Sequence, residues 1–127
     1  LRERLLGRVR EMAHAVPALW GVETQIEMTD CCPACVNDAQ MAEFVRTVAT
    51  RVLGAEQVSG DQRTTGADDM SLFLNAVPGA YFLVGSANAE RGLASPHHSP
   101  TFDFDEQALD VGVSVLTAVA LDFLHGG

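Results

Sequence analysis

The sequence predicts an α/β protein, and three observations support this fold class. Apolar residues recur at helical spacing in three long stretches, residues 1–16, 41–53 and 109–124. Residues 80–84 (AYFLV) are apolar on both faces, as in a strand that helices cover on each side. Residues 22–28 instead alternate in character, which is the two-residue period of a strand with one face in water.

The first thirty residues predict an amphipathic helix followed by one strand. Arginines lie opposite the apolar stripe of the helix, and Pro17 is expected to end it. The stripe consists of Leu1, Leu5, Val9, Met12 and Val16. The strand at residues 22–28 needs neighbours that pair with its backbone, yet the chain contains no second alternating segment. Its partner strands are therefore expected to lie outside this sequence.

The remaining residues predict a helix-rich α/β layer. Asn37 is placed to cap the helix at residues 41–53, and Gly54 is placed to end it. A short helix is expected at residues 69–76, before the covered strand. Asp105 is placed to cap the last helix. The stripe of this helix that we expect to be buried consists of Leu109, Val113, Leu116, Ala120 and Leu124.

Composition and charge limit the partners of the chain. Its 127 residues are 47% hydrophobic, and 17 acidic residues against 8 Lys and Arg give a net charge of −9. Because an acidic surface repels phosphates, nucleic acid is not an expected partner. We expect neither a signal peptide nor a membrane-crossing segment. Three cysteines, an odd number, favour reduced thiols, so a cytoplasmic location is expected.

The chain is expected to contain parts of two domains. Its character changes at residues 31–38, so residues 1–30 and 31–127 are assigned to different domains. It begins with Leu1 in place of an initiator Met, and it opens directly in a helical pattern. We therefore expect it to be a piece of a longer protein.

The motif CCPAC at residues 31–35 has two interpretations. Cys32 and Cys35 have the spacing of a redox pair or of half a zinc site. A zinc site needs four ligands, and the sequence contains no second cysteine pair or spaced histidine pair. The simpler interpretation is a hinge with small apolar side chains. The residues alone leave any role of Cys31, Cys32 and Cys35 undecided.

Asp68 and Asp69 stand at the start of the predicted short helix. They are suited to capping its free amides and to complementing its positive end. Alternatively, one of these carboxylates orients a ligand or lines a metal site, because α/β proteins keep their sites beside covered strands. Both interpretations stay open at this point.

His97 and His98 lie in a proline-flanked loop, SPHHSP, before the last helix. A loop of about twenty residues is long for a compact domain and is often functional. Pro96 and Pro100 stiffen the backbone around the two imidazoles, as holding a metal ligand in one orientation requires. The alternative is two exposed histidines without a ligand, because zinc or manganese needs further nitrogen or oxygen donors.

The order of these motifs resembles the C-terminal part of the amidohydrolase branch of metallopeptidase family M-20. That branch includes hippurate hydrolases, indoleacetyl-amino-acid hydrolases and N-acyl-amino-acid amidohydrolases. Asp68 and Met70 depart from it, standing where the family usually has Glu and Phe. The resemblance lies in CCPACVND (31–38), GADDMS (66–71), the Pro-Gly turn (78–79), the strand ending at Gly85, HSP (98–100), FDFDE (102–106) and the long last helix.

This resemblance implies a fold and an activity. Residues 1–30 correspond to the last helix and strand of a ferredoxin-like lid that makes a homodimer contact. Residues 31–127 correspond to the C-terminal part of a three-layer αβα, zinc-peptidase-like catalytic domain. The implied reaction is hydrolysis of the amide bond of N-acyl amino acids or peptide-like molecules, with two divalent metal ions (Zn, Mn, Co or Ni).

The resemblance also assigns the site residues. The family's last metal ligand maps to His98, in the pattern His-x-Pro. Adjacent residues of an extended loop point to opposite sides, so His97 and His98 are not both expected to reach the metals. The residues expected to line the site are Asp68, Asp69 and His97. The other ligands and the general-base Glu are expected upstream of Leu1, so this chain alone is expected to be inactive.

A hypothesis from another class competes with this one. The chain would then be a non-catalytic, acidic interaction module, or a divergent relative that has lost its metals. The presence or absence of the missing ligands upstream separates the two hypotheses.

Overall fold

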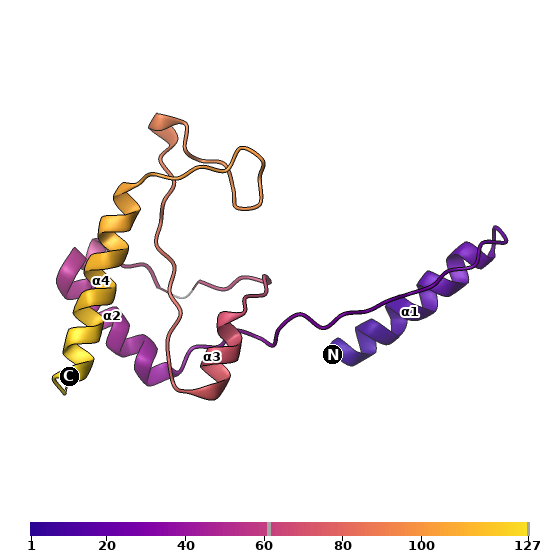
Figure 1. Cartoon of the computed structure of the whole chain (residues 1–127), viewed down its shortest axis with the longest axis horizontal. Coiled ribbons are helices and arrows are strands. Elements are labelled where there is room, and N and C mark those ends of the chain that lie inside the picture. Colours follow the sequence, from indigo (N-terminus) through magenta and orange to yellow (C-terminus); the bar gives the residue numbers. More distant parts are fainter. Residues whose placement is uncertain (61, 127) are drawn as a thin grey trace. The chain divides into compact units, whose positions relative to one another are not determined.

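The computed structural model describes residues 1–60 and 62–126, which form two compact units. The first unit is Leu1–Cys31, and the second begins at Cys32. Figure 1 shows the helices of both units, labelled α1 to α4. The assignment of these units to a lid and a catalytic domain stays a prediction.

The first unit consists of a helix and an extended segment. α1 spans Arg2–Ala18, so the helix continues one residue past Pro17, its expected end. The strand predicted at residues 22–28 is not confirmed, because within the described residues this segment is extended but pairs with no other strand. A sheet needs a neighbouring strand to share its backbone hydrogen bonds, and this segment has none.

The extended segment packs back along α1 (Figure 1). The Thr24 hydroxyl donates a hydrogen bond to the carbonyl oxygen of Ala13 at 2.9 Å. Arg2 forms an ion pair with Asp30, at the other end of the segment. Thr24, Ile26 and Met28 are half-buried, while Gln25 and Glu27 between them are exposed. The alternating pattern therefore packs one side of the segment against a helix.

α2 and α4 form the packed part of the second unit. α2 spans Ala39–Leu53 and α4 spans Gln107–Leu124. The rings of Phe44 and Phe123 meet edge to face, with centroids 6.3 Å apart. The buried apolar residues are Val45, Val48, Ala49 and Val115.

The predicted limits of α2 are close to the observed ones, but the predicted cap is wrong. The Asp38 carboxylate accepts hydrogen bonds from the backbone N–H groups of Gln40 (3.0 Å) and Met41 (2.9 Å). Asp38 therefore caps the helix in place of Asn37. Gly54 ends the helix as expected, with φ at 91°, a backbone conformation that favours glycine.

The segment between α2 and α4 contains short helices and extended chain. α3 spans Met70–Ala76, close to the short helix that the sequence predicts, and single 3₁₀ turns occupy Ala55–Gln57 and Ala89–Arg91. Within the described ranges the β pairing is limited to one isolated bridge, between Asn88 and Leu93.

Residues 80–84, predicted as a covered strand, are extended but unpaired in the part of the chain that the structure describes. Phe82 and Val84 are half-buried, whereas Tyr81 and Leu83 are exposed. A Cβ atom on Gly112 of α4 would meet Val84 at 4.0 Å, so the segment packs on this helix. Cover on both faces is not found within the described residues, where Tyr81 and Leu83 are exposed, so the covered strand stays a prediction.

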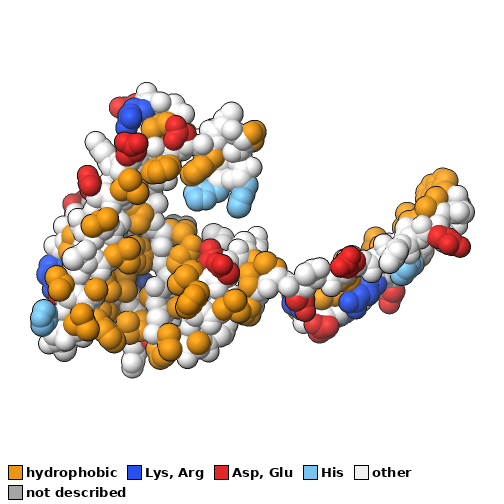
Figure 2. Space-filling model, viewed as in Figure 1, with side chains coloured by type: hydrophobic (Ala, Val, Ile, Leu, Met, Phe, Trp, Pro, Cys, Tyr) orange, Lys and Arg blue, Asp and Glu red, His pale blue; other side chains and the backbone are white. Residues whose placement is uncertain are grey.

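α4 also differs from its prediction. The stripe expected to be buried is exposed, with Leu109 at 57% and Leu116 at 58%, whereas Val115 is buried. Figure 2 shows hydrophobic side chains at the surface over this helix. Among the described residues, α4 is long and apolar enough to cross a membrane, so the expectation that no segment has this length and composition is wrong. The core helix of a water-soluble protein passes the same test. The apolar stripe of α4 thus lacks a covering partner in the described residues.

Candidate functional site

The two histidines occupy the middle of a tight turn. The Ser99 N–H donates to the Pro96 carbonyl oxygen at 3.2 Å, which closes the turn around His97 and His98. His98 has φ at 64° and is the one non-glycine residue with positive φ in the described ranges. The expected extended conformation is therefore wrong, and with it the argument that the two side chains must point to opposite sides.

The left-handed backbone of His98 is costly for a residue with a Cβ atom, so contacts around the turn must maintain it. Hydroxyl groups provide several of them. The Thr101 hydroxyl lies 3.0 Å from the Ser95 hydroxyl and 3.0 Å from the Ser99 hydroxyl. The Phe102 N–H donates to the Ser99 carbonyl oxygen at 3.0 Å, which closes a second turn directly after the first.

The two imidazoles have different surroundings. The His97 ring packs on the Phe102 ring, with centroids 4.5 Å apart. The His98 ring is exposed and meets the His97 ring edge on, with centroids 6.4 Å apart. Within residues 1–60 and 62–126 the His98 side chain makes no hydrogen bond or ion pair, so its nitrogens are open to an external partner. Figure 2 shows the two histidines of this loop side by side at the surface.

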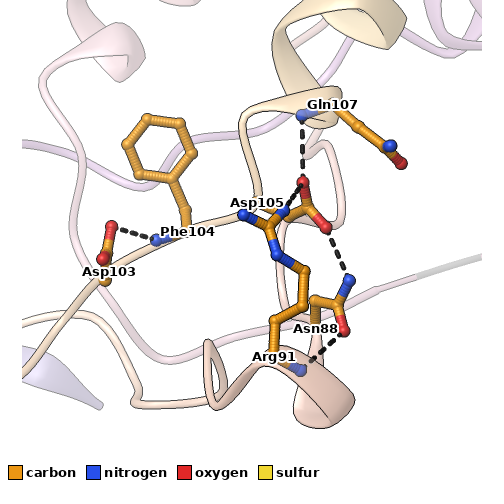
Figure 3. A network of polar contacts seen from close by, with 6 residues as sticks. All are labelled: Asn88, Arg91, Asp103, Phe104, Asp105 and Gln107. Atoms are coloured by element: carbon orange, nitrogen blue, oxygen red, sulfur yellow. Dashed lines mark hydrogen bonds and ion pairs between the residues drawn. The ribbon is translucent and has the colours of Figure 1, made fainter.

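The Asp105 carboxylate is the centre of a hydrogen-bond network where the loop that carries His97 and His98 meets α4 (Figure 3). Asp105 is 8% exposed. Its carboxylate accepts hydrogen bonds from the Asn88 amide (2.6 Å), the Arg91 guanidinium (2.9 Å) and the Gln107 N–H (3.2 Å). Its own N–H donates to the Ser86 carbonyl oxygen at 2.8 Å. Asp105 therefore joins both ends of the loop. The N-cap residue of α4 is Glu106, one residue after the predicted cap, although the Asp105 carboxylate still accepts from the Gln107 N–H.

The electrostatics of this network favour a charged carboxylate. The hydrogen bond from Asn88 lowers the pKa of Asp105 below its ordinary value, with the Gln107 N–H and Arg91 acting in the same direction. Asp105 is therefore ionised at neutral pH. Nothing in the local sequence pattern marks Asn88 and Arg91 as its partners, because they lie 17 and 14 residues away along the chain.

Asp68 lies in a second network, before α3. Its carboxylate accepts hydrogen bonds from the Met70 N–H (2.9 Å) and from the Tyr81 hydroxyl (3.0 Å). The hydrogen bond to Asp68 raises the pKa of Tyr81, and partial burial adds to the shift. Asp69 is exposed, and its side chain makes no capping hydrogen bond. Of the two predicted acids, Asp68 thus makes the capping contact and also holds a tyrosine.

Asn37 connects this network to the start of α2. Its side-chain amide donates to the Tyr81 carbonyl oxygen (2.9 Å), and its side-chain oxygen accepts from the Tyr81 N–H (2.8 Å). The Asp38 N–H donates to the Gly79 carbonyl oxygen at 3.0 Å. Asn37 thus forms the paired hydrogen bonds that a neighbouring strand would make, which is a role that its capping prediction missed.

The described residues do not complete a metal site by themselves. Within the ranges 1–60 and 62–126, no group of three or more His, Cys, Asp or Glu side chains is arranged to hold a metal ion. A hollow of about 330 Å³ is lined by residues 36–38 and 74–78, and none of the predicted site residues lines it. Both imidazoles of the histidine turn are exposed, and neither makes a hydrogen bond or ion pair within the described residues, so either could supply one nitrogen to a shared coordination sphere.

Residues 9–122 match the family described as Peptidase family M20/M25/M40. A protein named "Uncharacterized hydrolase y4tI" from Sinorhizobium fredii is 31% identical over 99% of this chain and 31% of its own length. "Thermostable carboxypeptidase 1" from Saccharolobus solfataricus is 27% identical over 97% of this chain and 31% of its own length. "IAA-amino acid hydrolase ILR1-like 4" from Arabidopsis thaliana is 33% identical over 72% of this chain and 21% of its own length.

The chain therefore spans at most about a third of the length of these curated relatives. No solved structure matches it significantly.

Proposed function

Because the chain belongs to Peptidase family M20/M25/M40, we propose that it is the C-terminal part of a metal-dependent amidohydrolase. The proposed reaction is hydrolysis of the amide bond of N-acyl amino acids or similar small amides. The observation that carries this proposal is the histidine turn. His98 stands in the pattern His-x-Pro, on a turn with left-handed backbone, and its imidazole has no hydrogen-bond partner in the described residues.

The donor chemistry of this turn fits the proposed metal. A neutral imidazole binds zinc, manganese, cobalt or nickel without cancelling the positive charge of the ion. Divalent metal ions in hydrolases polarise the scissile carbonyl and lower the pKa of water. One imidazole leaves most ligand positions open, so two metal ions require further ligands, and the reaction requires a general-base Glu, from residues upstream of Leu1.

The residues of this chain have distinct proposed roles. His98 binds one metal ion. His97, packed on Phe102, lines the site beside it and is not a ligand. Asp68 and Asp69 lie at the start of α3 as further candidates for lining the site. The contact between Asp68 and Tyr81 favours a supporting role for Asp68.

The names of the relatives support the substrate class. One relative is named an IAA-amino acid hydrolase and another a carboxypeptidase. Both names denote hydrolysis that involves an amino acid. We therefore favour a small amino-acid amide as substrate, and neither a nucleic acid nor a membrane lipid.

The first unit supports a further part of the proposal. α1 exposes an apolar stripe that includes Leu5, Val9 and Met12. We assign this unit to a lid domain whose surface contributes to a homodimer contact. A cytoplasmic location is also part of the proposal, since reduced thiols suit the cysteine-rich hinge.

The proposal is tested with the 127-residue chain and with a longer protein that includes the upstream residues. Each is loaded with Zn²⁺, Mn²⁺, Co²⁺ or Ni²⁺ and assayed with a panel of N-acyl amino acids. We expect turnover by the longer protein that a chelator abolishes, and no turnover by the 127-residue chain. Absence of metal binding and turnover in the longer protein would instead favour a non-catalytic interaction module or a metal-free relative.

A further inference from the structure

We infer that Asp105 is a positioning residue that fixes the histidine turn through Asn88 and Arg91, so that His98 is presented to metal in one orientation. This inference rests on the proposed function for its metal part. The part of the inference that concerns the position of the turn depends only on contacts within the second unit. Asp105 lies seven residues after His98 and touches neither the imidazole nor, in our proposal, the metal.

The first argument is the position of Asp105 at the base of the loop. Its N–H bonds to the Ser86 carbonyl oxygen at 2.8 Å, which brings together the two ends of the segment that carries the turn. Its carboxylate then bonds to Asn88 and Arg91, which belong to the outgoing half of that segment. The bridge between Asn88 and Leu93 lies immediately beyond, with distances of 2.7 and 2.8 Å between the backbone nitrogen and oxygen atoms.

The second argument is a continuous series of contacts from Asp105 to the turn. On the returning half of the loop, the rings of Phe104 and Phe102 stack, with centroids 6.4 Å apart. Phe102 in turn packs on the His97 ring at 4.5 Å. Thr101 joins the two halves through its hydroxyl contact with Ser95 at 3.0 Å. Both halves of the loop are therefore held between the Asp105 network and the histidines.

The third argument is the pattern of donors and acceptors. The Asn88 amide group donates to one oxygen of Asp105, while its own oxygen accepts from the Arg91 N–H at 3.2 Å. The other oxygen of Asp105 accepts from the Arg91 guanidinium and the Gln107 N–H. Each side-chain oxygen of Asp105 and Asn88 therefore faces a hydrogen-bond donor. A carboxylate at position 105 and an amide at position 88 satisfy all of these groups together.

This pattern separates positioning from simple helix capping. Asn caps helices about as well as Asp, so a cap alone would tolerate Asp105→Asn. In the network, however, an amide at position 105 would direct its NH₂ group at another donor. In one orientation this donor is the Asn88 NH₂ group, and in the other it is the Arg91 guanidinium together with the Gln107 N–H. The first conflict is relieved only if the Asn88 amide also turns over. In that case the Asn88 NH₂ group faces the Arg91 N–H. The single substitution therefore leaves at least one donor facing a donor.

A double exchange should restore the network. In Asp105→Asn with Asn88→Asp, the new carboxylate at 88 accepts from the Arg91 N–H and from the NH₂ group at 105. The side-chain oxygen at 105 then accepts from the Arg91 guanidinium and the Gln107 N–H. Every hydrogen bond is retained, and the one between positions 88 and 105 is reversed. The negative charge moves from position 105 to position 88, so the Arg91 guanidinium donates to a neutral oxygen in place of its present ion pair with Asp105. Asp103→Asn is the matched control, since Asp103 is exposed and, among the described residues, its carboxylate bonds only to the adjacent Phe104 N–H (Figure 3).

The experiment has two readouts. In the 127-residue chain, NMR measures the contact between the His97 and Phe102 rings, and the contact between Phe44 and Phe123 reports whether the helices remain folded. In the longer protein, titration with Zn²⁺ measures metal affinity. We expect Asp105→Asn to weaken the ring contact and to lower Zn²⁺ affinity by about 10-fold or more, as for residues that orient a ligand from outside the coordination sphere. The double variant should recover both values, and Asp103→Asn should match the wild type.

The outcomes distinguish this inference from the proposed function. A normal ring contact in Asp105→Asn, or a double variant as impaired as the single one, overturns the positioning role. If the longer protein binds Zn²⁺ equally well with and without His98, the proposed function fails. The NMR comparison of the single and double variants still decides whether Asp105 holds the turn.

Discussion

Asp68 and Asp105 both lie shortly before a helix, and each accepts a hydrogen bond from a backbone N–H at the start of that helix. Their other partners differ. Asp68 adds one neutral partner, the exposed Tyr81 hydroxyl. Asp105 is buried and adds an amide and a guanidinium from a distant part of the chain.

The difference shows how one residue type at one kind of position serves two purposes. Around Asp68, hydrogen bonds connect the start of α3 with Tyr81 and, through Asn37, with the start of α2. They hold the scaffold together. Around Asp105 the partners belong to the loop that carries the histidines, so this network determines the position of a candidate ligand.

The largest difference between the two networks is expected in amide hydrogen exchange, when the carboxylate of Asp105 or of Asp68 is removed. Asp105→Ala should raise the hydrogen-exchange rates of the Asn88 and Leu93 amides about tenfold, because a lost hydrogen bond at the loop base favours local opening. Asp68→Ala should leave these two rates unchanged and should raise exchange at Met70 instead. Equal rises at the Asn88–Leu93 bridge in both variants would contradict the separation of the two networks.

A smaller effect, on stability, is expected from a change at Asn37, which belongs to the network around Asp68. Asn37→Ala removes two hydrogen bonds to the Tyr81 backbone and should lower the free energy of unfolding of the second unit by about 1 kcal/mol. Urea unfolding followed by far-UV circular dichroism measures this change. Val36→Ala is the control, because Val36 is 70% exposed and should change stability by less than about 0.5 kcal/mol. A loss no greater than that of the control would show that Asn37 does not hold the scaffold.

The smallest effect concerns the pH dependence of Tyr81. Its pKa is raised in the folded chain, so the stabilisation from its hydrogen bond to Asp68 is complete below the ordinary pKa of 10.0 and is lost as the pH rises through the raised value. The effect on stability is small because Tyr81 is exposed. Tyr81 is the single tyrosine in the sequence, so its ultraviolet absorbance reports this pKa directly.

Asp68→Asn supplies the test of that assignment. Loss of the charge should move the titration of Tyr81 down toward its ordinary value, whereas Asp103→Asn should leave it unchanged. An identical titration in Asp68→Asn and the wild type would mean that Asp68 does not hold the tyrosine proton.

Much of the helical structure could be predicted from the sequence, because it depends on local signals. Apolar spacing located α1, α2 and α4, and Gly54 ended α2 as expected. The strands at residues 22–28 and 80–84 were not found as strands. An alternating or apolar segment becomes a strand only when a neighbour pairs with it. The apolar stripe of α4 was not found buried for a related reason, since burial needs a covering partner that the described residues do not supply.

The site was predictable in its residue types and less so in its geometry. The histidine pair and Asp68 were identified from local motifs. The turn at His98 was missed because no glycine marks its left-handed backbone. Asn88 and Arg91 were missed because their contacts with Asp105 join residues far apart in the sequence. The choice of His98 over His97 depends on the pattern His-x-Pro and on the packing of the His97 ring on Phe102, and it stays a prediction.

Metal analysis of a longer protein that includes the upstream residues tests this choice most directly. Wild type, His98→Ala and His97→Ala are purified without a chelator, and bound metal is measured per protein chain. We predict two metal ions in the wild type, loss of occupancy at one site in His98→Ala, and both ions retained in His97→Ala. Full metal content in His98→Ala, or a greater loss in His97→Ala, would contradict the assignment of His98 as the ligand.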